Sequence, residues 1–252
     1  KKAFDEINAG THKGVITINI ALSTDEGITP AVLNSNSADP ASYSSIYIKP
    51  SATNIVVTGN PAAGFGVIEL NGADNVTIDG SFNGTSSRDL TINNTGTSTN
   101  LANSCIRVAT SALVSSADDI TIKNCILNGN VTSGNAPGIT NTNTSSNVSF
   151  GIYFGGNGGA TEIAAPVALP TDGTFAAAQI GVSINSAVIQ NNLINQCGRA
   201  IMFNSADFSI SDAVTINNNI IGSSTALVYP YTAPVTTVYA KGIWVAGTNS
   251  LA

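Results

Sequence analysis

The chain has 252 residues, which is long enough to bury a sizeable core in one or two domains. Only 10% of the residues are charged, the net charge is −6, and the nine Lys and Arg residues are scattered, so we expect no nucleic-acid partner. The single histidine, His12, excludes chemistry that needs two imidazoles, such as a zinc site of the HExxH type. No apolar run approaches the roughly 18 residues of a membrane span, so we expect no span in this segment.

The first recognisable pattern is AFDEINAG at 3–10, which has helical character and ends in a glycine, a common helix stop. Strands are expected next at 15–21, 45–50 and 54–59. Because an open sheet edge invites pairing with other chains, we expect the short helix to cover that edge, with Phe4 and Ile7 as its buried contacts. We therefore predict an N-terminal cap and the first strands of a β-helix, an all-β fold, over residues 1–60, and the recurring patterns that follow indicate the same fold.

From residue 61 onward, three short strand patterns recur in a fixed order, and β-branched residues, which favour strands, supply most of their apolar content. The first pattern, Val-Thr-Ile or a close variant, recurs at 76–78, 120–122, 187–189 and 214–216. The second recurs at 90–92, 126–127, 193–194 and 220–221, and the third at 68–70, 106–108, 152–154, 201–203 and 243–245. Three short strands per repeat, joined by tight turns, predict a parallel β-helix whose coils span 61–252. Each strand pairs with its equivalent one coil further on, with flanking apolar residues inward and the middle residue outward.

Asparagines follow the first strand at a constant distance in three of the repeats. Asn124, Asn191 and Asn218 each stand two positions after the last Ile of that strand. Asparagine tolerates left-handed backbone at a turn, and its amide can bond the equivalent amides above and below. We therefore predict a structural asparagine ladder, since a neutral amide cannot act as a general base.

Two stretches, AFDEINAGTHKGVITINI at 3–20 and VIELNGADNVTIDGSFNGTSSRDLTINNTG at 67–96, carry a family resemblance together with the later coils. They resemble the right-handed parallel β-helix repeats of pectin-lyase-like proteins, and more closely those of very large secreted surface proteins of the Bacteroidota phylum. The latter proteins end in a type IX secretion sorting domain, which is not found in this sequence. The resemblance implies export, attachment or release at the cell surface, and a role in adhesion, gliding or contact with other cells. Because the stretch at 241–252 stops just after a strand, we expect the coils to continue in a longer, processed protein.

A polysaccharide-cleaving enzyme is the alternative that a β-helix raises, and the sequence offers no catalytic constellation for it. Asp118 and Asp119 form the only adjacent pair of aspartates, and no histidine lies near them. The outward residues after the first-strand Ile are Asp79, Lys123, Gln190 and Asn217. One carboxylate in that column is too few for a calcium site. Glu69 and Arg107, if they are one coil apart, are expected to form a surface ion pair. We predict no catalytic residue, no metal site and no cofactor.

Two features are candidates for binding. The first is an outward column of Tyr153, Met202 and Trp244 on adjacent coils, which predicts an exposed, partly aromatic stripe suited to a protein partner or a sugar. The alternative is that an inserted loop covers this stripe. The second feature is the set of long insertions at 129–149, 155–186 and 222–241. The last of them carries the contact candidates Tyr229, Tyr231 and Tyr239.

The three cysteines, Cys105, Cys125 and Cys197, cannot all pair within the chain. We expect buried free thiols, while a single disulfide or a link to another chain stays open as the alternative.

These observations predict a structural and adhesive segment of a large secreted protein on the cell surface or in an extracellular appendage. The expected partners are sister subunits and the surface of another cell or a glycan. The alternative is a β-helix module that binds carbohydrate or cleaves polysaccharides.

Overall fold

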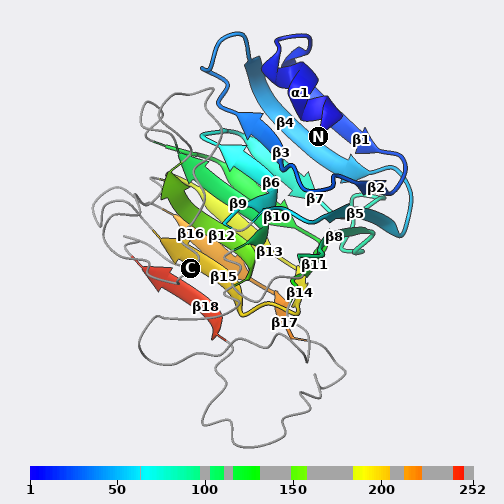
Figure 1. Cartoon of the computed structure of the whole chain (residues 1–252), viewed down its shortest axis with the longest axis vertical. Helices are drawn as coiled ribbons and strands as arrows, with labels where there is room; N and C mark the ends of the chain where they lie inside the picture. The colour runs from blue at the N-terminus through cyan, green and yellow to red at the C-terminus, as the bar shows by residue number, and fades with distance from the viewer. Residues whose placement is uncertain are drawn as a thin grey trace, which may run out of the picture.

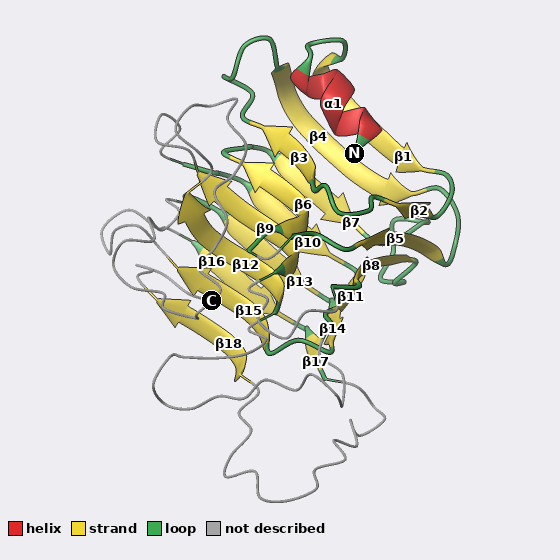
Figure 2. Ribbon diagram, viewed as in Figure 1, coloured by secondary structure: helices red, strands yellow, loops and turns green. Residues whose placement is uncertain are grey.

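The computed structural model describes residues 1–62, 64–96, 103–110, 116–130, 149–157, 184–204, 213–222 and 241–246. Within these residues the chain visits three parallel sheets of six strands in turn, so that one strand from each sheet makes one coil (Figure 1 and Figure 2). The coils stack from the N-terminal helix at one end to β18 at the other (Figure 1). This is the predicted parallel β-helix with a short N-terminal helix.

The three sheets are named A, B and C. Sheet A consists of β1 (Lys13–Ile20), β4 (Ser42–Pro50), β7 (Val76–Asp79), β10 (Ile120–Lys123), β13 (Ala187–Gln190) and β16 (Val214–Asn217). Sheet B consists of β2 (Thr24–Asp25), β5 (Ile55–Gly59), β8 (Leu90–Asn94), β11 (Cys125–Asn128), β14 (Leu193–Asn195) and β17 (Ile220–Ile221). Sheet C consists of β3 (Ala31–Asn34), β6 (Gly66–Asn71), β9 (Ser104–Thr110), β12 (Phe150–Asn157), β15 (Arg199–Asn204) and β18 (Lys241–Ala246).

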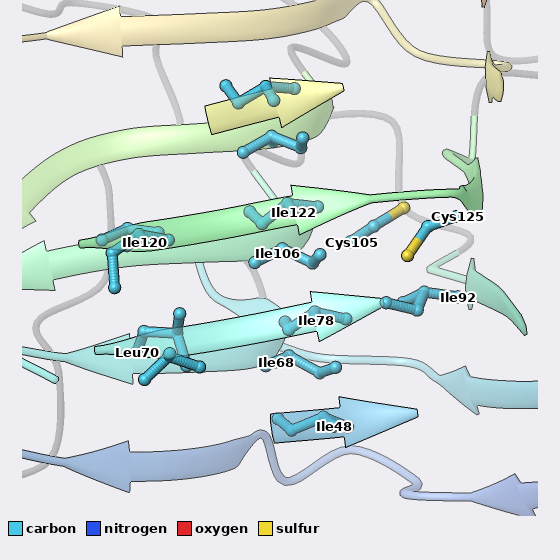
Figure 3. Packing of buried hydrophobic residues seen from close by; sticks show 14 of the residues in the cluster. Ile48, Ile68, Leu70, Ile78, Ile92, Cys105, Ile106, Ile120, Ile122 and Cys125 are labelled. Atoms are coloured by element: carbon cyan, nitrogen blue, oxygen red, sulfur yellow. The ribbon is translucent and has the colours of Figure 1, made fainter. Parts of the chain in front are cut away.

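Isoleucines at the same position of successive strands build the core. Ile48, Ile78 and Ile122 are matched in register across β4, β7 and β10, and none of their side chains is more than 3% exposed. Ile68 and Ile106 form the equivalent column in sheet C, and Figure 3 shows the two columns lying inside the coil. Burial of each such side chain stabilises the fold by about 1.5–3 kcal/mol. The recurring Ile positions therefore fix which face of these strands points inward.

The N-terminal helix covers the open edge of the first coil. Helix α1 (Lys2–Asn8) buries Phe4 and Ile7, which are 6% and 1% exposed, as predicted. The side chain of Asn8 makes the hydrogen bonds to β3 that a neighbouring strand would make. Its Nδ2 donates to the carbonyl oxygen of Val32 at 2.8 Å, and its Oδ1 accepts from the amide of Asn34 at 3.0 Å. Backbone groups on the free edge of β3 are thereby paired, which lowers the tendency of that edge to recruit another chain.

The first coil contains two strands, β2 and β3, that the sequence did not predict. In β3, Ala31 and Leu33 point into the core and are 3% and 0% exposed. They are matched in register with Ile68 and Leu70 of β6. Strands β2 and β3 therefore complete the first coil of the β-helix, which begins at β1.

Candidate functional site

Asparagines at the turn between sheets A and B lie one above another. Asn124, Asn191 and Asn218 have φ angles of 57°, 53° and 53°, in the left-handed region that asparagine tolerates. Nδ2 of Asn191 donates to Oδ1 of Asn124 at 2.7 Å, and Nδ2 of Asn124 donates to Oδ1 of Asp79 at 2.8 Å. The structure thus links two of the three predicted ladder residues and ends the ladder on Asp79. The side chain of Asn218 makes no hydrogen bond within the described part of the chain.

A second amide column, one residue further along, was missed by the sequence analysis. The buried side chain of Asn192 accepts from the amide of Cys125 at 3.0 Å and donates to the carbonyl of Ile122 at 2.9 Å. Asn219 repeats the motif by accepting from the amide of Asn192 at 2.9 Å and donating to Ile189 at 2.8 Å. These side chains pair backbone groups that the turn would otherwise leave unsatisfied. The Asn-Asn dipeptides at 191–192 and 218–219 were the signal for this column.

The segment 81–89 lies against the ladder and is tied to it. Nε and Nη2 of Arg88 donate to the carbonyl oxygen and to Oδ1 of Asn191, at 2.7 and 2.6 Å. In return, the ladder amides of Asn191 and Asn124 donate to the carbonyl oxygens of Ser86 and Thr85, at 3.0 and 3.2 Å. The segment forms one wall alongside the turn column, and its position is set by contacts to side chains and backbone far along the chain.

Asp79 is the buried anchor of this arrangement. Its carboxylate accepts from Tyr47 Oη at 2.6 Å and from the backbone amide of Ser81 at 3.0 Å, in addition to Asn124, and Nζ of Lys123 lies at 3.2 Å. Burial raises the pKa of Asp79, but the bonds from Tyr47, Asn124, Ser81 and Lys123 outweigh it and hold that pKa below its usual value. The negative charge of Asp79 is therefore compensated by groups of the protein itself, and only 1% of the residue is exposed to solvent.

A groove of about 340 Å³ opens between the segment 81–89 and the ends of the sheet A strands. It is lined by Thr85, Ser86, Lys123, Asn124, Gln190, Asn191 and Asn218. The outward residues Lys123, Gln190 and Asn217 follow one another in register on successive strands. This groove is a polar hollow that contains the three ladder asparagines.

The prediction that Tyr153 and Met202 form an exposed stripe on sheet C is wrong. The two residues are matched in register on β12 and β15, as predicted, but they are only 0% and 3% exposed. Trp244 is matched with Met202 along the backbone, and its side chain lies outside what the structure describes. The ring of Tyr153 packs on Phe150, with the ring centroids 4.8 Å apart. Tyr153 and Met202 are therefore buried side chains and form no exposed stripe.

Glu69 and Arg107 form the predicted ion pair, but the prediction that this pair lies on the surface is wrong. The residues are one coil apart, but both are 0% exposed, and Nη1 of Arg107 lies 3.6 Å from Oε2 of Glu69. Arg107 also donates to the carbonyl oxygens of Gly64 and Gly155, at 3.2 and 3.4 Å, while the amide of Gly66 donates to Glu69. Burial raises the pKa of Glu69 to about 7, although Arg107 and the Gly66 amide act in the opposite direction. Arg107 thereby ties strand β9 to the connection before β6 and to the neighbouring strand β12.

Aspartates near the starts of the sheet A strands bond from coil to coil. Oδ1 of Asp74 accepts from the backbone amide of Asp118 at 2.8 Å, and the Asp118 carboxylate accepts from the backbone and side chain of Asn185 at 2.9 and 2.7 Å. The adjacent pair of aspartates thus lies in a structural column. Within the described ranges, no group of three or more His, Cys, Asp and Glu residues is placed to hold a metal ion.

The cysteines are free thiols in this structure, with Cys105 and Cys125 in the core (Figure 3). Burial raises the pKa of all three thiols, to about 12 for Cys125 and Cys197 and well above the usual value for Cys105. A buried thiol with a raised pKa holds little nucleophilic thiolate at neutral pH. The three thiols are therefore packing groups.

Several binding candidates lie outside the described residues. These are Tyr229, Tyr231 and Tyr239, together with the central parts of the three long insertions.

Comparison of the chain with protein-family models, curated proteins and solved structures finds no match in any of the three. The described helix is too short and too polar to cross a membrane. Fold and site geometry alone therefore define the class, a three-sheet parallel β-helix with a ladder-lined polar groove.

Proposed function

We propose that this chain is a structural and adhesive segment of a large secreted protein, located on the cell surface or in an extracellular appendage. Its role is to present a rigid lateral surface to sister subunits and to another cell or surface. The extracellular location and the type IX export route rest on the resemblance of 3–20 and 67–96 to Bacteroidota surface proteins.

One observation carries the structural part of the proposal: the carboxylates of the coils are used to bind neighbouring coils. Asp74 and Asp118 hold backbone amides of the next coil, Asp79 receives Asn124, and Glu69 pairs with Arg107. A general acid or base must reach a substrate proton within hydrogen-bond distance. These four carboxyl groups instead stiffen the stack, which suits a protein that transmits load between cells.

The stack also favours a mechanical role because of how its bonds are arranged. Each coil is joined to the next through backbone hydrogen bonds in all three sheets, and side-chain amides at the turns add bonds between the later coils. Repeat proteins of this kind are built as quasi-one-dimensional arrays. Such an array carries lateral surfaces at a fixed spacing, as an adhesin or appendage subunit requires.

The first test is where the native protein sits and what shape it has. Antibody raised against the chain should label intact source cells, and material sheared from those cells should contain slender rods or larger assemblies by electron microscopy and light scattering. Labelling that requires permeabilised cells would contradict the proposal. Rods that occur only as monomers would remove sister subunits from the list of partners.

A polysaccharide-cleaving enzyme is tested separately by incubating the chain with acidic and neutral polysaccharides and assaying new reducing ends and unsaturated products. We expect no product. Product that disappears on replacing Glu69 or Asp79, in a variant that still folds, would replace the adhesive proposal with an enzymatic one.

A further inference from the structure

The groove beside the ladder presents groups that both donate and accept hydrogen bonds. Apart from Lys123, every residue that lines it carries a side-chain amide or a hydroxyl group. Among the described lining residues there is no carboxylate and no aromatic ring. At about 340 Å³ the groove falls in the lower part of the size range of small-molecule sites. Its chemistry matches a ligand rich in hydroxyl groups.

The lining divides into amides that are fixed and amides that are free. Asn191 is held by four hydrogen bonds, from Arg88 and to Ser86 and Asn124, so its position is set before any ligand arrives. The side chains of Gln190 and Asn218 have no hydrogen-bond partner within the described part of the chain, and Asn218 is exposed. A fixed wall with two uncommitted amides is a site whose polar groups can be satisfied by a ligand at a small ordering cost.

Outward polar residues beside the groove recur with the period of the coils. Lys123 is matched in register with Gln190, and Gln190 with Asn217. Equivalent residues on neighbouring strands are about 4.8 Å apart. A row of donors and acceptors at constant spacing suits a linear polymer whose hydroxyl groups also recur, better than it suits a compact ligand.

The charge of the groove favours an uncharged ligand. Among the described residues that line it, the one cation is Lys123, which is one third exposed and lies 3.2 Å from the carboxylate of Asp79 beneath it. The two charges offset each other, so an acidic polymer gains little from this ammonium group. A nucleic acid would need a surplus of basic side chains to neutralise its phosphates, which the groove lacks.

We propose that this groove binds a neutral saccharide chain laid across successive coils, contacted by Gln190 and Asn218 and by the fixed amide of Asn191. The inference rests on the proposed adhesive function, to which it adds a ligand class. Because no aromatic platform lines the groove, binding depends on hydrogen bonds, and each free amide contributes about three- to tenfold in affinity. Adhesion then arises from many such sites acting together.

The test uses the 252-residue chain and short oligosaccharides of glucose, mannose, galactose and N-acetylglucosamine, with oligogalacturonate and a sulfated oligosaccharide as acidic probes. Saturation-transfer NMR detects weak binding, and titration gives the dissociation constants. The variants are Gln190→Ala and Asn218→Gly, the latter chosen because glycine keeps the left-handed backbone. Asn60→Ala, an exposed asparagine that does not line the groove, is the matched control.

We expect at least one neutral oligosaccharide to bind, each groove variant to weaken that binding about three- to tenfold, and Asn60→Ala to leave it unchanged. Three results overturn the inference: no neutral oligosaccharide binds, the acidic probes bind more tightly than every neutral one, or the groove variants bind as well as the parent chain. Adhesion of source cells to the immobilised variants separates the two proposals. Adhesion that survives both groove variants refutes the groove alone, whereas a protein absent from the cell surface refutes the adhesive function.

Discussion

Replacing Arg107 with methionine removes a buried cation of sheet C and leaves Glu69 without the guanidinium group that lies 3.6 Å from it. The carboxyl group then becomes neutral by taking up a proton, and at pH 8 this costs about 5 kcal/mol for a group of ordinary pKa 4.5. In the parent protein, raising the pKa of Glu69 to about 7 already costs about 3 kcal/mol at this pH. The loss of the ion pair therefore adds about 1–2 kcal/mol.

Among the described residues, the same substitution removes the hydrogen bonds that Arg107 donates to the carbonyl oxygens of Gly64 and Gly155. Each buried acceptor that loses its donor costs about 1 kcal/mol. The sum for Arg107→Met is about 3–4 kcal/mol of unfolding free energy, in the range typical of a broken buried ion pair. In the double variant Glu69→Gln, Arg107→Met the carboxyl penalty vanishes, so its stability should return to within about 1 kcal/mol of the parent.

Urea unfolding at pH 8, followed by circular dichroism with a common slope for all variants, measures these differences. The single variant Glu69→Gln completes the double-mutant cycle and gives the coupling energy of the pair. The reasoning is refuted if Arg107→Met costs less than about 1 kcal/mol, or if the double variant is no more stable than Arg107→Met.

Four further outcomes are expected. Because the pKa of Glu69 in the folded protein lies above its ordinary value, the native state holds this proton more tightly than the unfolded chain does. The free energy of unfolding should therefore fall by about 3 kcal/mol as the pH rises from 4.5 through 7. A free energy of unfolding that does not change with pH in the parent, or the same slope after Glu69→Gln, would contradict this. Ile122→Ala should cost about 3–4 kcal/mol in urea unfolding, since the side chain is 0% exposed between two other isoleucines; a cost below 1 kcal/mol would mean that the coil closes over the gap. Asn192→Ala should lower the free energy of unfolding by about 2–3 kcal/mol, because the backbone amide of Cys125 loses its hydrogen-bond acceptor. The control Asn60→Ala should leave that free energy almost unchanged. The three thiols should stay unreactive toward a thiol reagent until the chain unfolds, and rapid labelling of Cys125 in the native state would show that its core is open.

The β-helix could be predicted because its main determinant is local and repeats along the chain. Each first strand carries its inward residues at fixed positions, as Ile78 and Ile122 do, and tight turn residues follow at a constant distance. Strand β3 escaped prediction because it occurs once, before the pattern is established, and is followed by a connection of different length. The position of β3 is set by its pairing with β6, which lies about 30 residues later in the chain, and a local sequence pattern cannot reveal that pairing.

The candidate site was predicted less well, for a different physical reason. Alternation along a strand tells only that Glu69, Arg107 and Tyr153 point away from the core. Whether such residues meet solvent depends on other parts of the chain, and the carbonyl groups that reach Arg107 come from Gly64, in the connection before β6, and from Gly155, in strand β12. The groove by the ladder likewise depends on Arg88 and the segment around it.

The bond between Arg88 and Asn191 joins residues 103 positions apart and passes over one whole coil, since Arg88 follows β7 and Asn191 follows β13, with β10 between them. In a linear array where only nearest neighbours interact, coils can melt one at a time from either end. A bond to the second neighbour removes that independence, because the middle coil cannot open while its two neighbours remain fastened together. Pulled along its axis, this part of the stack should yield as a single block of three coils instead of as a zipper.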